Sequence, residues 1–368
     1  MSTAQAAVSK DLSQERLGGL RRYVALDAYR GFIMLLLASD GFGFAALKSD
    51  PGWGRVASWF DHVPWEGAVF WDMIQPAFMF MVGVAMPFAM ARRIENGATW
   101  GDNLRHVLTR SLLLIILSQV LMSVSRGRIT PQLINVLSQI AFTYFLSFLI
   151  MRWNWRYQVM AAAALLAFWT ALLFAFPGPD GPFSKINSVG LVVDRAIFHY
   201  DYDPAYSTLN FIPSTVWTLA GVWVGRLLMT TRSHFEKLRL LAAGMAISFV
   251  LALALRPWIP MIKQLCTPSF IFYSIGWVLF MFIGFYWLIE VRGWRRAAFP
   301  LVIVGMNSIF IYSVSELLHR WFDRAVGVFT FHFSFLGTFA PVAQSTAVLL
   351  VLWYLCYWLY KQRIFIRL

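Results

Sequence analysis

The stretch FDHVPWEGAVFWDMIQPAFMFMVGVAMPF, residues 60–88, begins as a polar loop and continues as an apolar run typical of a membrane helix. Its first half carries Asp61, His62, Glu66 and Asp72. An ionisable side chain beside hydrocarbon costs on the order of several kcal/mol unless it is paired or used. The stretch therefore predicts a membrane helix with a candidate functional site at its entrance.

The chain has the composition of a polytopic membrane protein. Of its 368 residues 59% are hydrophobic and only 13% are charged, whereas roughly 25% are charged in soluble proteins. Backbone groups in hydrocarbon must all be hydrogen-bonded, which leaves only helices or a closed barrel, and the long apolar runs exclude the barrel. The fold class is all-α, with about ten membrane helices in one bundle. They are predicted near 26–47, 67–91, 107–125, 132–151, 157–176, 209–230, 238–258, 268–290, 298–318 and 337–360.

Basic residues predict the orientation of the helices. With the N-terminus placed inside, the inner segments carry roughly twice as many Lys and Arg as the outer ones, so both termini are predicted to be cytoplasmic. This asymmetry accounts for the net charge of +13 without a nucleic-acid partner. Residues 1–22 are expected to form a cytoplasmic tail, and 23–368 a single transmembrane domain. Cys266 and Cys356 lie far apart, and no metal site is expected.

The opening stretch offers two candidate catalytic residues. A neutral imidazole such as that of His62 can take a proton from an attacking amine or hydroxyl, and it can also carry an acyl group. Asp72 is placed about a turn and a half inside the second helix, where Pro76 can bend the backbone. The alternatives are that His62 belongs to an aromatic belt and that Asp72 pairs with a neighbouring helix.

The first helix begins with LDAYRGF, in which Asp27 and Arg30 share a face and can pair. An arginine at the inner edge of the membrane can bind phosphate, although a structural ion pair explains it equally well. Ser39 and Asp40 lie near the outer end of this helix, and Asp40 is a candidate to face His62.

The segment GMNSIFIYSVSEL, residues 305–317, places polar side chains within an apolar helix. Asn307 and Glu316 point to different faces, whereas a pore lining would repeat on one face. We therefore expect individual contacts to a bound ligand, or hydrogen bonds between helices. The polar side chains are Asn307, Ser308, Tyr312, Ser315 and Glu316.

These motifs resemble the bacterial relatives of heparan-α-glucosaminide N-acetyltransferase, within a superfamily of transmembrane acyltransferases. The resemblance rests on LDAYRGF, HVPWEG and WDMIQPAFMFMVGVAMPF, and it extends in the same order through most of the chain. It continues through VLSQIAFTYFL (136–146), DYDPAYSTLNFIPSTVWTLAGVWVG (201–225), KQLCTPSFIFYSIGWVLF (263–280) and GWRRAAFPLVIVGMNSIFIY (293–312).

The resemblance implies a multi-pass protein of the bacterial inner membrane that transfers an acetyl or other short acyl group. Acetyl-CoA is the implied donor, and the amine or hydroxyl of a sugar or glycan is the implied acceptor at the outer face. The resemblance implies that His62, the first residue of the H-x-x-W-x-G pattern, is the active-site histidine. Membrane lipids are further expected partners, and a homodimer is left open.

Further roles follow from this interpretation. Asp72 or Asp40 is expected to orient the imidazole, and Asn307 to donate a hydrogen bond to the thioester oxygen. The candidates for binding the donor are Arg30, Asp27, Lys263, Thr267 and Ser269. The main alternative is a transporter or flippase of a sugar or lipid, because buried charges near a helix break also mark transport pathways. A structural or assembly protein is a third alternative.

Overall fold

A computed structural model of the protein describes residues 16–17, 20–21, 23–199 and 206–366. Most of the predicted tail, residues 1–22, lies outside this part of the chain, as do the first five residues of the DYDPAYSTLNF motif. The described part of the tail holds a short antiparallel pair of strands, β1 (Arg16–Leu17) and β2 (Leu20–Arg21). Apart from this pair the regular structure is helical, as the sequence predicts.

The longer helices follow the apolar segments. They are α2 (Val24–Ala38), α4 (Ile74–Glu95), α5 (Trp100–Arg126), α6 (Val136–Met151), α7 (Trp155–Ala175), α9 (Phe211–Met229), α10 (His234–Leu255), α11 (Pro268–Tyr286), α12 (Arg295–Met306), α13 (Ser308–Thr330) and α14 (Ala340–Lys361). The connections contain α3 (Gly54–Ala57), α8 (Val189–Phe198), the π-helical turn η5 (Trp287–Val291) and five 3₁₀ turns. These turns are η1 (Gly41–Leu47), η2 (Ser58–Phe60), η3 (Phe70–Met73), η4 (Thr208–Asn210) and η6 (Phe331–Phe339).

The helices make this a multi-pass membrane protein. Within the described residues, seven helical stretches are long and apolar enough to cross a membrane, or eight if α2 and η1 form one bent span. One of the seven, Ser308–Lys361, joins α13, η6 and α14, and α6 is a shorter apolar helix. The expected number of ten spans therefore remains a prediction.

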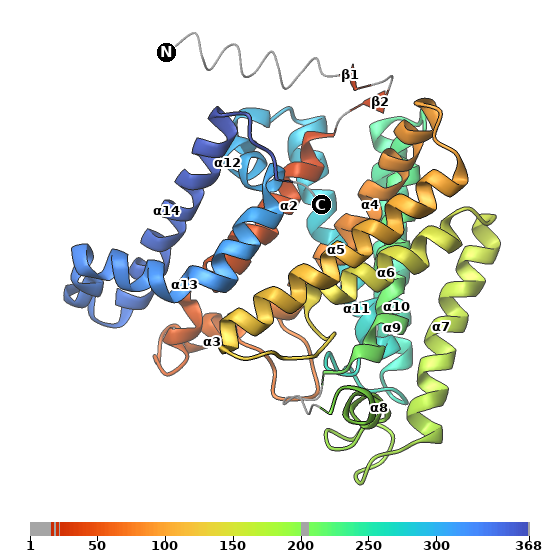
Figure 1. The fold of residues 1–368 in the computed structure, drawn as a ribbon, viewed down its shortest axis with the longest axis horizontal. Coiled ribbons are helices and arrows are strands. Elements are labelled where there is room, and N and C mark those ends of the chain that lie inside the picture. Colours follow the sequence, from red (N-terminus) through yellow and green to blue (C-terminus); the bar gives the residue numbers. More distant parts are fainter. Residues whose placement is uncertain (1–15, 18–19, 22, 200–205, 367–368) are drawn as a thin grey trace.

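Two groups of helices lie side by side in Figure 1. One group contains α2, α12, α13 and α14, and the other contains α4 to α7 and α9 to α11. Close backbone contact holds each group together. A Cβ added to Gly31 of α2 would collide with the Leu301 carbonyl oxygen of α12, and one added to Gly83 of α4 would collide with that of Thr218 in α9. Small residues allow such close packing where lipid offers no hydrophobic driving force.

Three helix boundaries differ from the expected ones. Asp72 lies in η3, before α4 begins at Ile74, and not a turn and a half inside a helix. Pro76 consequently sits in the first turn of α4, directly after η3. The segment expected at 298–318 is divided at Asn307 into α12 and α13. The chain also breaks after α2, because Asp40 and Phe42 have positive φ.

Candidate active site

A cavity of about 370 Å³ lies between the two helix groups. Leu37, Tyr312 and Glu316 come from the α2–α13 group. The remaining walls come from the other group and its loops, namely from His62, Trp71, Ile74, Gln75, Phe78, Met122, Ile134, Asn135, Val136, Leu137, Tyr206 and Lys263. Most of these residues lie at the same ends of their helices, so the cavity is near one face of the bundle.

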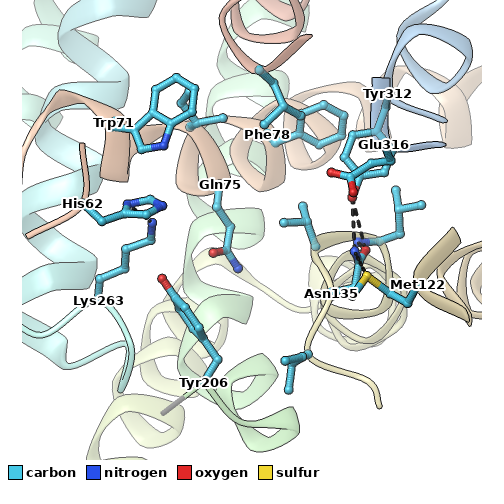
Figure 2. Close-up of a pocket in the computed structure, with 15 residues that line it drawn as sticks. His62, Trp71, Gln75, Phe78, Met122, Asn135, Tyr206, Lys263, Tyr312 and Glu316 are labelled. Carbon is cyan, nitrogen blue, oxygen red and sulfur yellow. Dashed lines mark hydrogen bonds between the residues drawn. The ribbon is translucent and has the colours of Figure 1, made fainter. Parts of the chain in front are cut away.

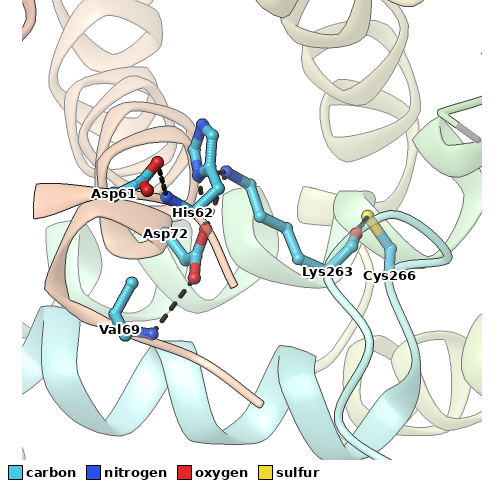
Figure 3. A network of polar contacts seen from close by, with 6 residues as sticks. All are labelled: Asp61, His62, Val69, Asp72, Lys263 and Cys266. Carbon is cyan, nitrogen blue, oxygen red and sulfur yellow. Dashed lines mark hydrogen bonds and ion pairs between the residues drawn. The ribbon is translucent and has the colours of Figure 1, made fainter. Parts of the chain in front are cut away.

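His62 is oriented by a buried carboxylate. Its Nδ1 lies 2.7 Å from Oδ1 of Asp72, whose side chain is 1% exposed, whereas the imidazole is 49% exposed. Figure 3 shows the other ring nitrogen pointing away from Asp72. A carboxylate that accepts Nδ1–H fixes the ring and leaves Nε2 free to accept a proton. With this geometry Nε2 can act as a general base.

Local backbone structure places both side chains. Oδ2 of Asp72 accepts the N–H of Val69 at 3.1 Å, which satisfies a free donor at the start of the η3 turn. The backbone N–H of His62 donates to Oδ1 of Asp61 at 2.8 Å. The ends of the loop between Asp61 and Val69 are thus tied down by carboxylates that neighbour it in sequence.

Lys263 completes the cluster from a distant part of the chain. Its Nζ lies 3.1 Å from Oδ1 of Asp72, and its side chain is only 8% exposed. Burial lowers the pKa of this ammonium group, and the charge of Asp72 opposes that effect. Nζ also lies 3.1 Å from Nδ1 of His62. Oδ1 of Asp72 is therefore placed to accept hydrogen bonds from both the Lys263 ammonium group and the His62 imidazole.

The turn that carries Lys263 is held by two hydroxyl groups. Thr267 accepts the N–H of Ile262 at 3.0 Å and donates to the Pro260 carbonyl at 2.7 Å. Ser269 donates to the same carbonyl at 2.9 Å. The N–H of Gly67 donates to the carbonyl of Met261 at 2.8 Å, which joins this turn to the loop of His62. Thr267 and Ser269, expected to bind the donor, are placed as supports of Lys263.

The opposite wall of the cavity is also polar. Figure 2 shows His62 and Lys263 on one side, Tyr312 and Glu316 on the other, and Gln75 between them. The hydroxyl of Tyr312 lies 3.3 Å from Nδ2 and 3.4 Å from Oδ1 of Asn135. Tyr312 and Glu316 were noted in the sequence as polar residues of an apolar helix, and both line the cavity.

The other predicted site residues lie elsewhere. Asp40 is exposed at the break after α2, and Asp72 holds the imidazole. Asn307 is buried at the junction of α12 and α13. Its Nδ2 donates to the Ile364 carbonyl at 3.2 Å, and its Oδ1 accepts the N–H of Ile366 at 3.0 Å. These bonds use both of its polar atoms to hold the end of the chain.

Asp27 and Arg30 pair as their spacing predicts. Nη1 of Arg30 lies 3.5 Å from Oδ1 of Asp27, and the two side chains are 26% and 18% exposed. Both residues belong to α2 and are separate from the residues that line the cavity.

Three of the polar lining residues were not singled out from the sequence. Gln75 follows Asp72 by three residues, and this helical spacing could have indicated that both face one site. Tyr206 stands in the quoted DYDPAYSTLNF motif, but no local pattern distinguished it from the other tyrosines. Asn135 caps α6, its Oδ1 accepting the Leu137 N–H at 2.9 Å. The role of Asn135 as a helix N-cap gives no reason by itself to expect this residue in a cavity.

Among the described residues, no group of three or more His, Cys, Asp or Glu side chains is arranged to hold a metal ion.

The fold and the site define a multi-pass helical membrane protein with a histidine–carboxylate pair in a cavity. No protein-family model matches the chain. It is 22% identical over 383 aligned residues to heparan-alpha-glucosaminide N-acetyltransferase of Mus musculus, covering 86% of the chain and 56% of that protein. For the Homo sapiens protein of the same name, the identity is 21%, with 82% and 54% covered.

The chain is thus a distant relative of these acetyltransferases, and the resemblance drawn from its motifs is confirmed. It spans about half the length of the curated relatives it matches. At the level of the family, the likeness supports an acyltransferase-type function.

Proposed function

We propose that the protein transfers an acetyl or other short acyl group from acyl-CoA to an amine or hydroxyl of a sugar or glycan. The relatives are N-acetyltransferases by name, and their name specifies an α-glucosaminide acceptor. The observation that carries the proposal here is the 2.7 Å contact between Nδ1 of His62 and Oδ1 of buried Asp72, at the edge of a cavity. Such a pair prepares Nε2 for proton transfer.

The proposed reaction uses His62 as its general base. Nε2 takes a proton from the acceptor as its nitrogen or oxygen attacks the thioester carbonyl. The tetrahedral intermediate then collapses, the C–S bond breaks, and the thiolate of CoA recovers the proton from the imidazolium. The products are the acylated acceptor and free CoA. In the alternative two-step path, Nε2 itself attacks the thioester and passes the acyl group to the acceptor.

Asp72 and Lys263 act as positioning residues in this proposal. The Asp72 carboxylate favours the Nδ1–H tautomer and stabilises the imidazolium that forms during transfer. Lys263 neutralises that carboxylate, because its Nζ lies 3.1 Å from the same oxygen. The site therefore keeps a buried carboxylate ionised while the imidazole stays available to accept a proton.

The substitution His62→Ala tests the proposal. General-base assistance is worth roughly 10²–10⁴-fold, so the transfer rate of the purified protein should fall by at least about that factor. Binding of CoA and the thermal unfolding midpoint should both stay near the wild-type values, since the imidazole is half exposed. Near-normal transfer by His62→Ala would make the histidine a residue of the membrane interface. Movement of sugar into liposomes without acylation would favour a transporter.

A further inference from the structure

Glu316 places a carboxyl group in the wall of the cavity. The cavity is lined by three ionisable side chains that can be charged near neutral pH, His62, Lys263 and Glu316. Lys263 is paired with Asp72. Within the described part of the chain, no hydrogen bond or ion pair to the Glu316 carboxylate is found. A carboxylate in a membrane helix without a partner is costly, and such residues commonly mark a ligand pathway.

The neighbours of Glu316 suit a hydroxyl-rich ligand. Tyr312 lies one helical turn earlier on α13, so its hydroxyl and the Glu316 carboxylate share a face. Figure 2 shows both side chains directed toward Asn135. The contacts between Tyr312 and Asn135 are long, 3.3 and 3.4 Å, and a ligand can replace them. The group offers carboxylate and amide acceptors together with amide and hydroxyl donors.

The two opposite walls of the cavity can contact different parts of one bound ligand. His62 and Lys263 stand on one wall, and Tyr312 and Glu316 on the other, so a ligand in the cavity can contact both. Trp71, on the side of His62, and Phe78, on the side of Glu316, add aromatic surface. The part of the acceptor that reacts belongs beside His62, and the rest of the molecule then extends toward Glu316.

We propose that Glu316, Tyr312 and Asn135 form the subsite that holds the hydroxyl groups of the acceptor, and that the Glu316 charge selects against anionic sugars. The inference rests on the proposed function for its acceptor class. A neutral or cationic sugar can donate hydrogen bonds to the carboxylate. A sugar carrying a carboxylate or sulfate places a second negative charge in the same cavity, where attraction and repulsion are screened less than in water. Like-charge contacts are a direct means of rejecting wrong partners.

Binding of methyl glucoside and methyl glucuronide tests the subsite without requiring catalysis. The two sugars differ in that a hydroxymethyl group is replaced by a carboxylate. The dissociation constants are measured by saturation-transfer NMR on the full chain of 368 residues in detergent. We expect the wild type to bind the neutral sugar at least about tenfold more tightly, the effect of ~1.4 kcal/mol of charge repulsion. Glu316→Gln keeps the shape and should bring this ratio close to one.

Two further variants distinguish an effect of the Glu316 charge from the loss of any other negative charge and from a general loss of sugar binding. Glu66→Gln removes an equal charge from an exposed residue outside the cavity and should leave the ratio unchanged. Tyr312→Phe should weaken binding of both sugars by a similar factor and keep the ratio. The proposal is overturned if Glu316→Gln leaves the ratio as in the wild type, if Glu66→Gln changes it equally, or if the wild type binds neither sugar. Acyl transfer to glucosamine, measured separately, reports on the proposed function itself.

Discussion

Oδ1 of Asp72 lies 2.7 Å from Nδ1 of His62 and 3.1 Å from Nζ of Lys263. One buried carboxylate oxygen therefore connects a half-exposed imidazole to a buried ammonium group. Removing the negative charge should have two separable consequences, one for the orientation of the ring and one for the burial of the lysine.

Asp72→Asn should reduce both activity and stability. The amide cannot stabilise the imidazolium, and a comparable change in a serine-protease triad lowers turnover by about 10⁴. It also leaves the buried Lys263 charge without its partner, a loss worth roughly 3–5 kcal/mol. The double variant Asp72→Asn/Lys263→Met should recover much of the stability but not the activity. Transfer rates and unfolding midpoints in detergent provide both readings. Recovery of activity in the double variant would contradict the positioning role of Asp72.

Stability should depend on the protonation of Asp194, which lies on α8. Burial raises the pKa of this carboxyl, and the Thr208 N–H that bonds its Oδ2 at 2.8 Å partly opposes the effect. Because the folded-state pKa exceeds the unfolded one, near 3.9, the folded state binds more protons between the two values. The contribution of Asp194 to stability is therefore full below the unfolded pKa and is lost as pH rises through the folded pKa.

Asp194→Asn should flatten this part of the pH dependence, because the amide oxygen can still accept the Thr208 bond. The unfolding midpoint is measured from about pH 3.5 to 7.5, on either side of the ordinary carboxyl pKa. Asp180→Asn, at an exposed residue of the same connection, is the matched control. Equal pH profiles for Asp194→Asn and the wild type would show that this carboxyl does not couple to folding.

Arg30 is predicted to bind a phosphate group of the donor. Hydrogen bonds to charged groups are worth about 1.5–3 kcal/mol, so Arg30→Ala should weaken CoA binding by roughly ten- to a hundredfold. Asp27→Asn, which removes its partner at 3.5 Å, should leave CoA binding intact or strengthen it. Titration calorimetry with CoA measures both. Unchanged affinity for CoA in Arg30→Ala would show that Arg30 and Asp27 form an ion pair that only orients α2.

The predicted orientation places both termini in the cytoplasm. Single cysteines at Arg55 and Lys185 should then react with an impermeant maleimide added outside intact cells, and one at Phe235 should not. All three positions lie outside the buried core, and the native Cys266 and Cys356 are buried and should contribute little background. Labelling at Phe235 from outside, or protection at Lys185, would reverse the orientation of the helices between them.

The sequence by itself determined the class of the protein and supplied His62 and Asp72 as candidates for one site, with Asp40 as the alternative to Asp72. Hydropathy is a local property matched to the thickness of a bilayer, so the apolar segments could be found one at a time. His62 and Asp72 are ten residues apart, on the two sides of a short loop, and their closeness follows from that connection. The motifs around them were enough to indicate the distant acetyltransferase relatives.

Only the tertiary structure decided what surrounds that pair. Lys263 is 191 residues from Asp72, and Tyr312 is 177 residues from Asn135, so their contacts depend on which helices pack together. Apolar segments look alike to hydropathy, and their neighbours are chosen by backbone approach at residues such as Gly83 and by hydrogen bonds between helices. For the same reason Asn307, polar and within an apolar segment, could be noticed in the sequence, but only packing shows that it holds Ile364 and Ile366.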